Sequence, residues 1–96
     1  MIPNNRISTH PGKILLREFL EPLNLTSEQL AGHLDVSSQL IGEIIDGNRA
    51  VSPEIAWLFS QSFETTPEFW LNLQTLHDLS ANRPLRQVTP IAEAVS

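Results

Sequence analysis

Apolar side chains recur every three to four residues in five short segments of the chain, which is the spacing of amphipathic helices. The first segment begins at Pro11, and Pro22 is expected to end it because proline donates no amide hydrogen bond. The other four segments cover about residues 26–34, 38–46, 53–63 and 67–79. No alternating pattern typical of a strand appears before the tail. The sequence therefore predicts an all-α fold with five helices.

Residues that favour helix ends punctuate these segments. N-cap side chains are expected at Thr26, three residues before Gln29 as in a capping box, and at Ser37, Ser52 and Thr66. A proline and a glutamate follow both Ser52 and Thr66, and they suit the first turn of a helix. Gly47 stands where a glycine commonly closes a helix. These signals support the helix boundaries given by the periodicity.

The fifth predicted helix is apolar on more than one side. Its apolar surface is larger than four short helices can cover. One explanation is a fully buried central helix, and the other is a homodimer seam. We favour the homodimer. Its expected interface residues are Trp57, Phe69, Trp70, Leu73 and Leu76.

Residues 26–47 have the layout of a helix-turn-helix, in which one short helix crosses the DNA backbone and the next enters the major groove. Ala31 is small where the two helices approach each other, and Val36 fills the turn between them. Ile41 and Ile44 anchor the second helix, whose first turn is polar. The spacing alone leaves open a helical hairpin that serves only packing.

The length and composition of the chain indicate a single small domain. The chain has 96 residues, 41% of them hydrophobic, and no cysteine, which excludes disulfides and a thiolate zinc site. The absence of cysteine favours a reducing, cytoplasmic location. No apolar run approaches the roughly 18 to 20 residues that span a bilayer and no export signal is visible, so the protein is expected to be soluble and not secreted. The helix-turn-helix domain is assigned to residues 1–80. Residues 81–96, with Pro84 and Pro90, are expected to form an extended or loose tail.

The charge distribution does not favour DNA binding. The chain carries a net charge of −5, and residues 26–78 hold eight carboxylates against a single cation, Arg49. Any phosphate contacts must therefore come from the flanks, from Arg49 and from backbone amides at helix starts. The acidity leaves open a different role, an interaction module that binds a basic protein partner and little DNA.

Three stretches of the chain carry a family resemblance. TSEQLAGHLDVSSQLIGEIIDGNR, residues 26–49, resembles the helix-turn-helix of phage-repressor-like (XRE) regulators. HPGKILLREFLEPLNLT, residues 10–26, and TTPEFWLNLQTLHDL, residues 65–79, are similar to HigA-type antitoxins, also called VapI-like or plasmid-maintenance antidote proteins. The resemblance implies a five-helix repressor-like fold and a homodimer that binds and represses its own operator. It also implies neutralisation of a small basic HigB-type toxin, a messenger RNA endonuclease; a stand-alone XRE regulator is the alternative.

The resemblance assigns base contacts to the first turn of the second helix. Ser38 and Gln39 lie there, with Glu43 one turn further on, and the Gln39 amide can pair with an adenine edge. Leu40 is expected to face outward, either toward a thymine methyl or as a surface leucine. Phosphate contacts are expected from Arg49 and from residues at helix starts. The latter are Thr26, Ser27, Gln29 and Ser37.

Two features depart from the family pattern. Asp35 stands where glycine is common, so a left-handed backbone is expected at a residue with a side chain. Glu43 and Asp46 lie on or near the recognition helix without a lysine or arginine beside them, and they are expected to repel phosphates. Both features reduce the expected affinity for DNA more than they affect the fold.

Catalytic and metal chemistry find no support in the sequence. His10, His33 and His77 are far apart and lack partners at ligand spacing, so they are expected at the surface or at helix ends. There is no glycine-rich phosphate loop, nucleophile elbow or carboxylate cluster. We predict no enzyme activity, no metal and no cofactor.

Overall fold

The structure, a computed structural model, describes residues 6–94, and every regular element in that range is a helix. The first helix is continuous but changes type along its length, from α1 (Pro11–Ile14) through the π-helical η1 (Leu15–Leu20) to α2 (Glu21–Leu23). It is followed by α3 (Ser27–Leu34), α4 (Ser38–Ile45), α5 (Pro53–Phe63), α6 (Pro67–Ala81) and, in the tail, α7 (Ile91–Ala94). The predicted all-α fold is confirmed.

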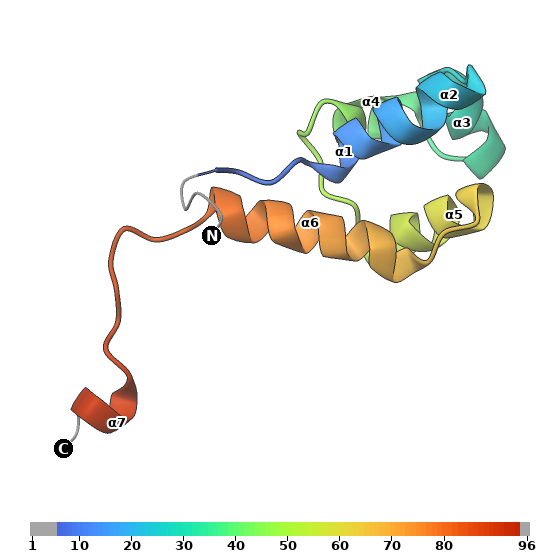
Figure 1. Ribbon diagram of the computed structural model, residues 1–96. Coiled ribbons are helices and arrows are strands. Elements are labelled where there is room, and N and C mark those ends of the chain that lie inside the picture. Colours follow the sequence, from blue (N-terminus) through green and yellow to red (C-terminus); the bar gives the residue numbers. More distant parts are fainter. Residues whose placement is uncertain (1–5, 95–96) are drawn as a thin grey trace.

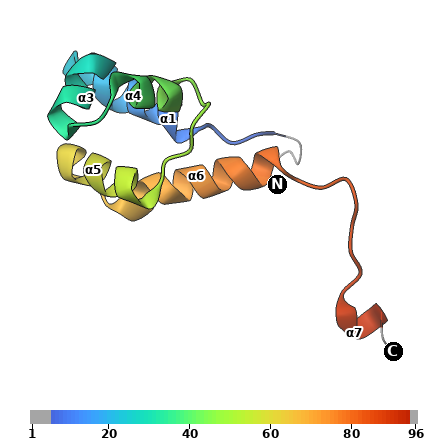
Figure 2. The same ribbon diagram turned by 180° about the vertical axis from the view of Figure 1, so that it is seen from behind.

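The helices form two layers (Figure 1). The first helix, α3 and α4 make one layer, α5 and α6 make the other, and both views show the layers facing each other (Figure 2). Trp70 and Phe59 are the largest fully buried side chains, and their rings meet edge to face with centroids 5.0 Å apart. Phe19 of the first helix reaches Trp70 across the layers at 5.2 Å. This aromatic cluster joins the layers.

Pro22 does not end the first helix as predicted. The amide of Glu21 donates to the carbonyl of Leu16, five residues back, so the turns before the proline are wider than α-helical turns. A wider turn relieves the clash between a proline ring and the carbonyl four residues before it. The helix therefore runs to Leu23 and ends at Asn24, whose φ of 57° is left-handed.

The predicted N-caps and the closing role of Gly47 are confirmed, whereas α6 runs to Ala81, two residues past its predicted end at about Leu79. The Thr26 hydroxyl accepts from the Gln29 amide at 3.1 Å, and the Gln29 side chain accepts from the Thr26 amide at 2.8 Å, which completes the capping box. Ser37, Ser52 and Thr66 each cap their helices through a side-chain oxygen. Gly47 has a φ of 80° and Asp35 a φ of 58°, so both adopt the expected left-handed conformation.

Gly12 lets α1 approach α4 more closely than any other residue could. A Cβ atom built on Gly12 would lie 1.8 Å from the carbonyl oxygen of Ile44, deep inside the contact distance. Ile44 is itself fully buried, so this close approach helps to fix the position of α4 against the first helix. The apolar periodicity of the sequence gives no sign of this contact.

A buried glutamine fastens the loop between α4 and α5 to the second layer. The Gln74 side-chain oxygen accepts from the Val51 amide at 2.8 Å, and its amide nitrogen donates to Asp78 at 2.9 Å. Both hydrogen bonds satisfy polar atoms that burial would otherwise leave unpaired. Gln74 thereby links the end of the helix-turn-helix to α6.

His10 is at a helix end, as predicted, but it is buried. Its Nδ1 accepts from the Gly12 amide at 2.9 Å, and its ring packs edge to face on His77 with centroids 4.8 Å apart. His77 Nδ1 in turn donates to the Ser8 carbonyl at 2.8 Å. His33 is exposed on α3. Between residues 6 and 94 no group of three histidine or acidic side chains is placed to hold a metal.

The stability of the chain is expected to fall as the pH drops below about 6.5, the ordinary pKa of histidine. Burial lowers the pKa of His10, the neighbouring His77 lowers it further, and Asp78 opposes them. The unfolded chain therefore binds this proton more readily than the folded chain. The stabilisation is complete above the ordinary pKa and is lost as the pH falls through the folded pKa. Urea unfolding between pH 5 and 8 measures the effect.

A matched variant separates His10 from the other histidines. His10→Asn keeps a side-chain oxygen that can cap α1 but does not titrate. We expect its free energy of unfolding to depend less on pH than that of the wild type, whereas His33→Asn keeps the wild-type dependence. Equal pH dependence in all three proteins would contradict this role for His10.

The tail leaves the body of the molecule after α6. Residues 82–90 contain no helix, and Figure 1 shows them running away from the two layers. The short helix α7 was not expected in a tail assigned as extended or loose. Leu85, Val88 and Ile91 are exposed along it. In the described chain, no helix is both long and apolar enough to cross a membrane.

Candidate nucleic-acid interface

The α3–turn–α4 unit is held from below by apolar contacts. Ile41 and Ile44 of α4 are fully buried, Ala31 of α3 is buried, and Val36 packs against the same core from the turn. The Val36 amide donates to the Ala31 carbonyl at 3.0 Å, which closes the turn. With one face of α4 buried in this way, Ser38 and Gln39 in its first turn are exposed.

Three polar side chains on and after α4 form one network. The Gln39 amide nitrogen donates to one carboxylate oxygen of Glu43 at 3.0 Å, and Arg49 Nε donates to the other at 2.7 Å. The hydrogen bonds from Arg49 and Gln39, in that order, lower the pKa of Glu43. Glu43 is thus ionised at neutral pH and holds both residues on the exposed side of α4.

This network corrects the expectation that Glu43 has no cation beside it. Arg49 follows the turn at Gly47, and that reversal brings its guanidinium back to α4. The negative charge of Glu43 is therefore paired within the chain, and it opposes phosphates less than the sequence suggested. The i, i+4 spacing of Gln39 and Glu43 was a signal available in the sequence, whereas the Arg49 contact depended on the turn.

Leu40 is placed differently from the prediction. It is half-buried and packs against the core cluster. The reason is its helical position, because Leu40 precedes the fully buried Ile44 by four residues and therefore lies next to it on the surface of α4. Its side chain is therefore not fully available to a thymine methyl.

The predicted phosphate-contacting residues lie at two helix starts. Thr26 and Gln29 are exposed at the start of α3, with their side chains engaged in the capping box. Ser27 is half-buried, and its hydroxyl donates to Glu28 at 3.3 Å. Ser37 is exposed at the start of α4 and caps it. These positions, like those of Ser38, Gln39 and Arg49, leave DNA contact by these residues a prediction.

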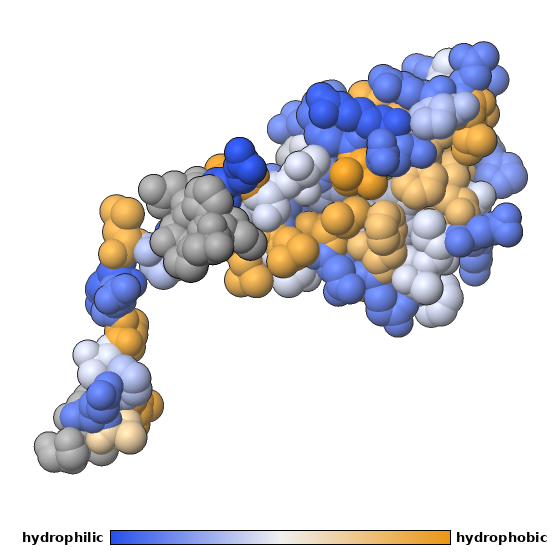
Figure 3. All heavy atoms as spheres, in the orientation of Figure 1, coloured by the Kyte–Doolittle hydropathy of each residue, from blue (hydrophilic) through white to orange (hydrophobic). Residues whose placement is uncertain are grey.

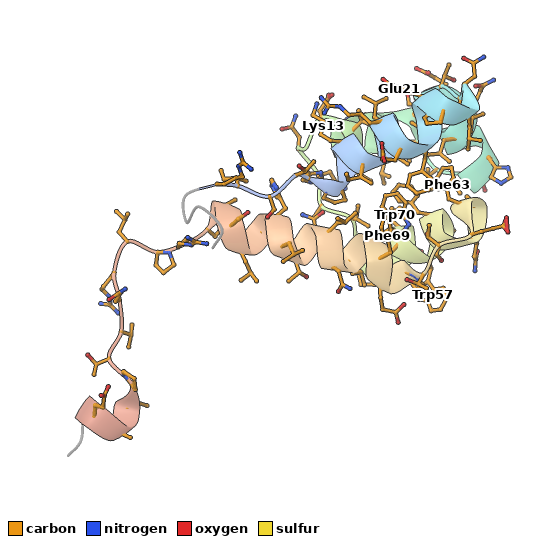
Figure 4. All side chains as sticks on the ribbon, in the orientation of Figure 1. Lys13, Glu21, Trp57, Phe63, Phe69 and Trp70 are labelled. Carbon is orange, nitrogen blue, oxygen red and sulfur yellow. The ribbon has the colours of Figure 1, made fainter. Side chains whose placement is uncertain are left out.

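Four of the five residues predicted at a dimer seam retain exposed surface. Trp57 is 57% exposed and Leu76 55%, Phe69 is also exposed, and Leu73 is half-buried. Figure 4 shows Trp57 pointing away from the body, and Figure 3 shows hydrophobic side chains along α6. The predicted fifth helix, which is α6, is therefore not fully buried.

Trp70 is the exception, and its assignment to the seam is corrected. Its side chain is fully buried between the layers, and its indole nitrogen donates to the Thr65 hydroxyl at 2.8 Å. Periodicity could not separate Trp70 from Phe69, because α6 is apolar around more than half of its circumference. The contacts of Phe19 and Phe59 with Trp70 show that Trp70 faces the core rather than the exposed side of α6.

Comparison with known proteins agrees with this geometry. A family model described as Helix-turn-helix matches residues 16–70, which include all of α3, α4 and α5. This chain belongs to the helix-turn-helix family. The match includes the whole Gln39–Glu43–Arg49 network and ends at the buried Trp70.

Similarity to individual proteins gives a more specific assignment within the helix-turn-helix family. An uncharacterised HTH-type transcriptional regulator of Haemophilus influenzae is 44% identical over 85 residues, which cover 85% of this chain and 79% of that protein. The Pseudomonas aeruginosa antitoxin HigA, solved with the higBA promoter, is 34% identical with a TM-score of 0.74 and covers 76% of this chain and 79% of its own. A further Pseudomonas aeruginosa protein, solved with its 18-bp operator, is 29% identical with a TM-score of 0.81. The match covers 86% of this chain and 96% of that protein. The resemblance of this helix-turn-helix chain to HigA-type antitoxins is confirmed.

Proposed function

We propose that this chain is the antitoxin of a toxin–antitoxin pair and a homodimeric repressor of its own operator. The observation that carries the proposal is the exposed Gln39–Glu43–Arg49 network on a recognition helix anchored by its other face. The similarity to a HigA antitoxin solved with its promoter supports the same function.

In this proposal α4 enters the major groove and Gln39 contacts a base. Donation of one N–H to Glu43 leaves Gln39 a second N–H and its side-chain oxygen, the pair of groups that an adenine edge requires. Arg49 uses Nε for Glu43, so its terminal nitrogens remain for a phosphate. Glu43 therefore positions a base-contacting and a phosphate-contacting residue together.

Gln39→Ala is expected to lower affinity for the operator by roughly 5- to 150-fold, the equivalent of one adenine contact of about 1–3 kcal/mol. Affinity for a scrambled duplex should change little. Fluorescence anisotropy with the DNA upstream of the coding region, at two salt concentrations, measures both affinities. Gln61→Ala, at an exposed glutamine on α5, is the matched control.

Two results would contradict the operator-binding proposal. One is equal affinity of the wild type for the upstream and scrambled duplexes. The other is an affinity that does not fall with added salt, because a protein that contacts several phosphates releases counterions when it binds.

The homodimer is proposed to form through the exposed apolar side chains of α5 and α6. Trp57, Phe69 and Leu76 offer that surface, with Leu73 at its edge, whereas Trp70 has none to offer. A twofold axis there would present two copies of α4 to half-sites about one helical turn, roughly 34 Å, apart. Sedimentation at micromolar concentration tests the dimer.

The toxin partner is proposed on electrostatic grounds. A net charge of −5 suits association with a basic protein, such as an enzyme that binds and cleaves RNA. Co-purification of a small basic protein encoded beside this chain would support the pairing. Operator binding without any such partner would instead favour a stand-alone regulator; the Haemophilus influenzae relative is named a transcriptional regulator.

A further inference from the structure

A groove runs across the end of the molecule where α2, α3 and α5 meet. It consists of two adjoining cavities of about 280 and 430 Å³ that share Leu23, Ser62 and Phe63. We call it the α2–α5 groove. Its other lining side chains are Leu25, Gln29, Leu30 and His33 in the first cavity and Glu18, Phe19, Pro22 and Glu64 in the second.

The floor of the α2–α5 groove is apolar and reaches the surface. Leu23 is 57% exposed, and Phe63 and Leu25 are half-buried against the core. Figure 4 shows Phe63 between the two layers, below the end of the first helix. An occupant with one or two apolar side chains would remove this surface from water.

The rim of the groove is acidic. Glu18 and Glu64 line the second cavity. The C-terminal ends of α2 and α5 also lie at the groove, and helix C-termini carry partial negative charge. Neither carboxylate pairs with a cation in the portion of the chain described. The rim therefore attracts a cation and repels phosphates.

Glu64 occupies its place at a cost to stability. Its φ of 58° is left-handed, a conformation that glycine adopts freely and that strains residues with a side chain. Its carboxylate also sits at the negative end of α5. A glutamate that is unfavourable for the fold on both counts suggests that its charge serves binding.

We propose that the α2–α5 groove is the docking site of the basic toxin partner. An apolar side chain of the toxin seats on Leu23 and Phe63, and flanking lysines or arginines pair with Glu18 and Glu64. A second copy of this chain is a poorer occupant, because it would bring a second excess of negative charge to the rim. The inference rests on the proposed antitoxin function.

The test measures affinity for the purified small basic protein encoded beside this chain, by biolayer interferometry with the full-length chain. Glu64→Gly removes the carboxylate and relieves the backbone strain. We expect the melting temperature to rise by about 4–8 °C while affinity for the toxin falls at least tenfold. Leu23→Lys, at an exposed position, should also lower affinity at least tenfold.

Asp35→Gly is the matched control for Glu64→Gly. Asp35 has the same φ of 58° and the same charge, but it lies at the turn between α3 and α4 and does not line the groove. Its melting temperature should rise as well, while affinity for the toxin stays within twofold of the wild type. Increased stability with lost binding in Glu64→Gly alone cannot be attributed to unfolding.

The possible results separate this inference from the function on which it rests. If the wild type and both groove variants bind the toxin equally, the toxin docks elsewhere and the antitoxin function stands. If the wild type binds operator DNA but no basic protein, both the toxin pairing and the groove inference fail. If Leu23→Lys changes the sedimentation of the chain alone, the groove is an interface between copies, and the inference is overturned.

Discussion

Replacing Gly12 with alanine is expected to destabilise the chain by about 3 kcal/mol or more, a large fraction of the stability of a small domain. The added methyl carbon would lie 1.8 Å from the Ile44 carbonyl oxygen and 2.6 Å from the carbonyl carbon. Both are backbone atoms of a fully buried residue, so no side-chain rotation relieves the overlap. The first helix must move away from α4 and open the core.

Gly32 provides the control for this substitution. It lies exposed within α3, and a Cβ built on it meets nothing within 4 Å. Gly32→Ala should stabilise the chain by about 0.5–1 kcal/mol, the usual gain for alanine in a helix. Urea unfolding followed by circular dichroism measures both variants. A Gly12→Ala protein as stable as the wild type would show that α1 and α4 do not approach as described.

Trp70→Ala is expected to cost about 3–5 kcal/mol, the usual range for removing a large aromatic side chain from a core. The side chain is fully buried, and its ring lies 5.0 Å from Phe59 and 5.2 Å from Phe19. Its removal leaves a cavity between the two layers and deprives the Thr65 hydroxyl of its hydrogen-bond donor. Thermal unfolding and tryptophan fluorescence would report the loss.

Trp57→Ala is the matched substitution on the surface. Trp57 is 57% exposed on α5, so its removal should change the stability of the dilute protein by no more than about 0.5 kcal/mol. If α5 and α6 form the dimer seam, the same variant should shift sedimentation toward the monomer. A Trp57→Ala protein that unfolds as readily as Trp70→Ala would contradict the packing described for both residues.

Part of the candidate site could be predicted from sequence. The exposed first turn of α4 follows from the cap at Ser37 and the apolar spacing of Ile41 and Ile44. The pairing of Glu43 with Arg49 could not be predicted, because it depends on the direction of the chain after Gly47. The expectation of an unpaired Glu43 was wrong for this reason.

Local signals in the sequence account for the helices from α1 to α6 and for most of their ends, but not for the short helix α7. A cap at Thr26, a proline after Ser52 and a glycine at position 47 act through hydrogen bonds and torsions within one turn of the chain, so their effects can be inferred without the fold. Pro22 does not follow the rule that a proline ends an α-helix, because the turns before it are π-helical and wider than α-helical turns.

Only the tertiary structure decided which apolar side chains are buried and which helices touch. Trp70 and Phe69 are neighbours on α6, yet one is fully buried and the other exposed. Gly12 and Ile44 are far apart in sequence, and their backbones meet. Burial and close approach depend on surfaces supplied by distant segments, and helical periodicity carries no information about where those segments lie.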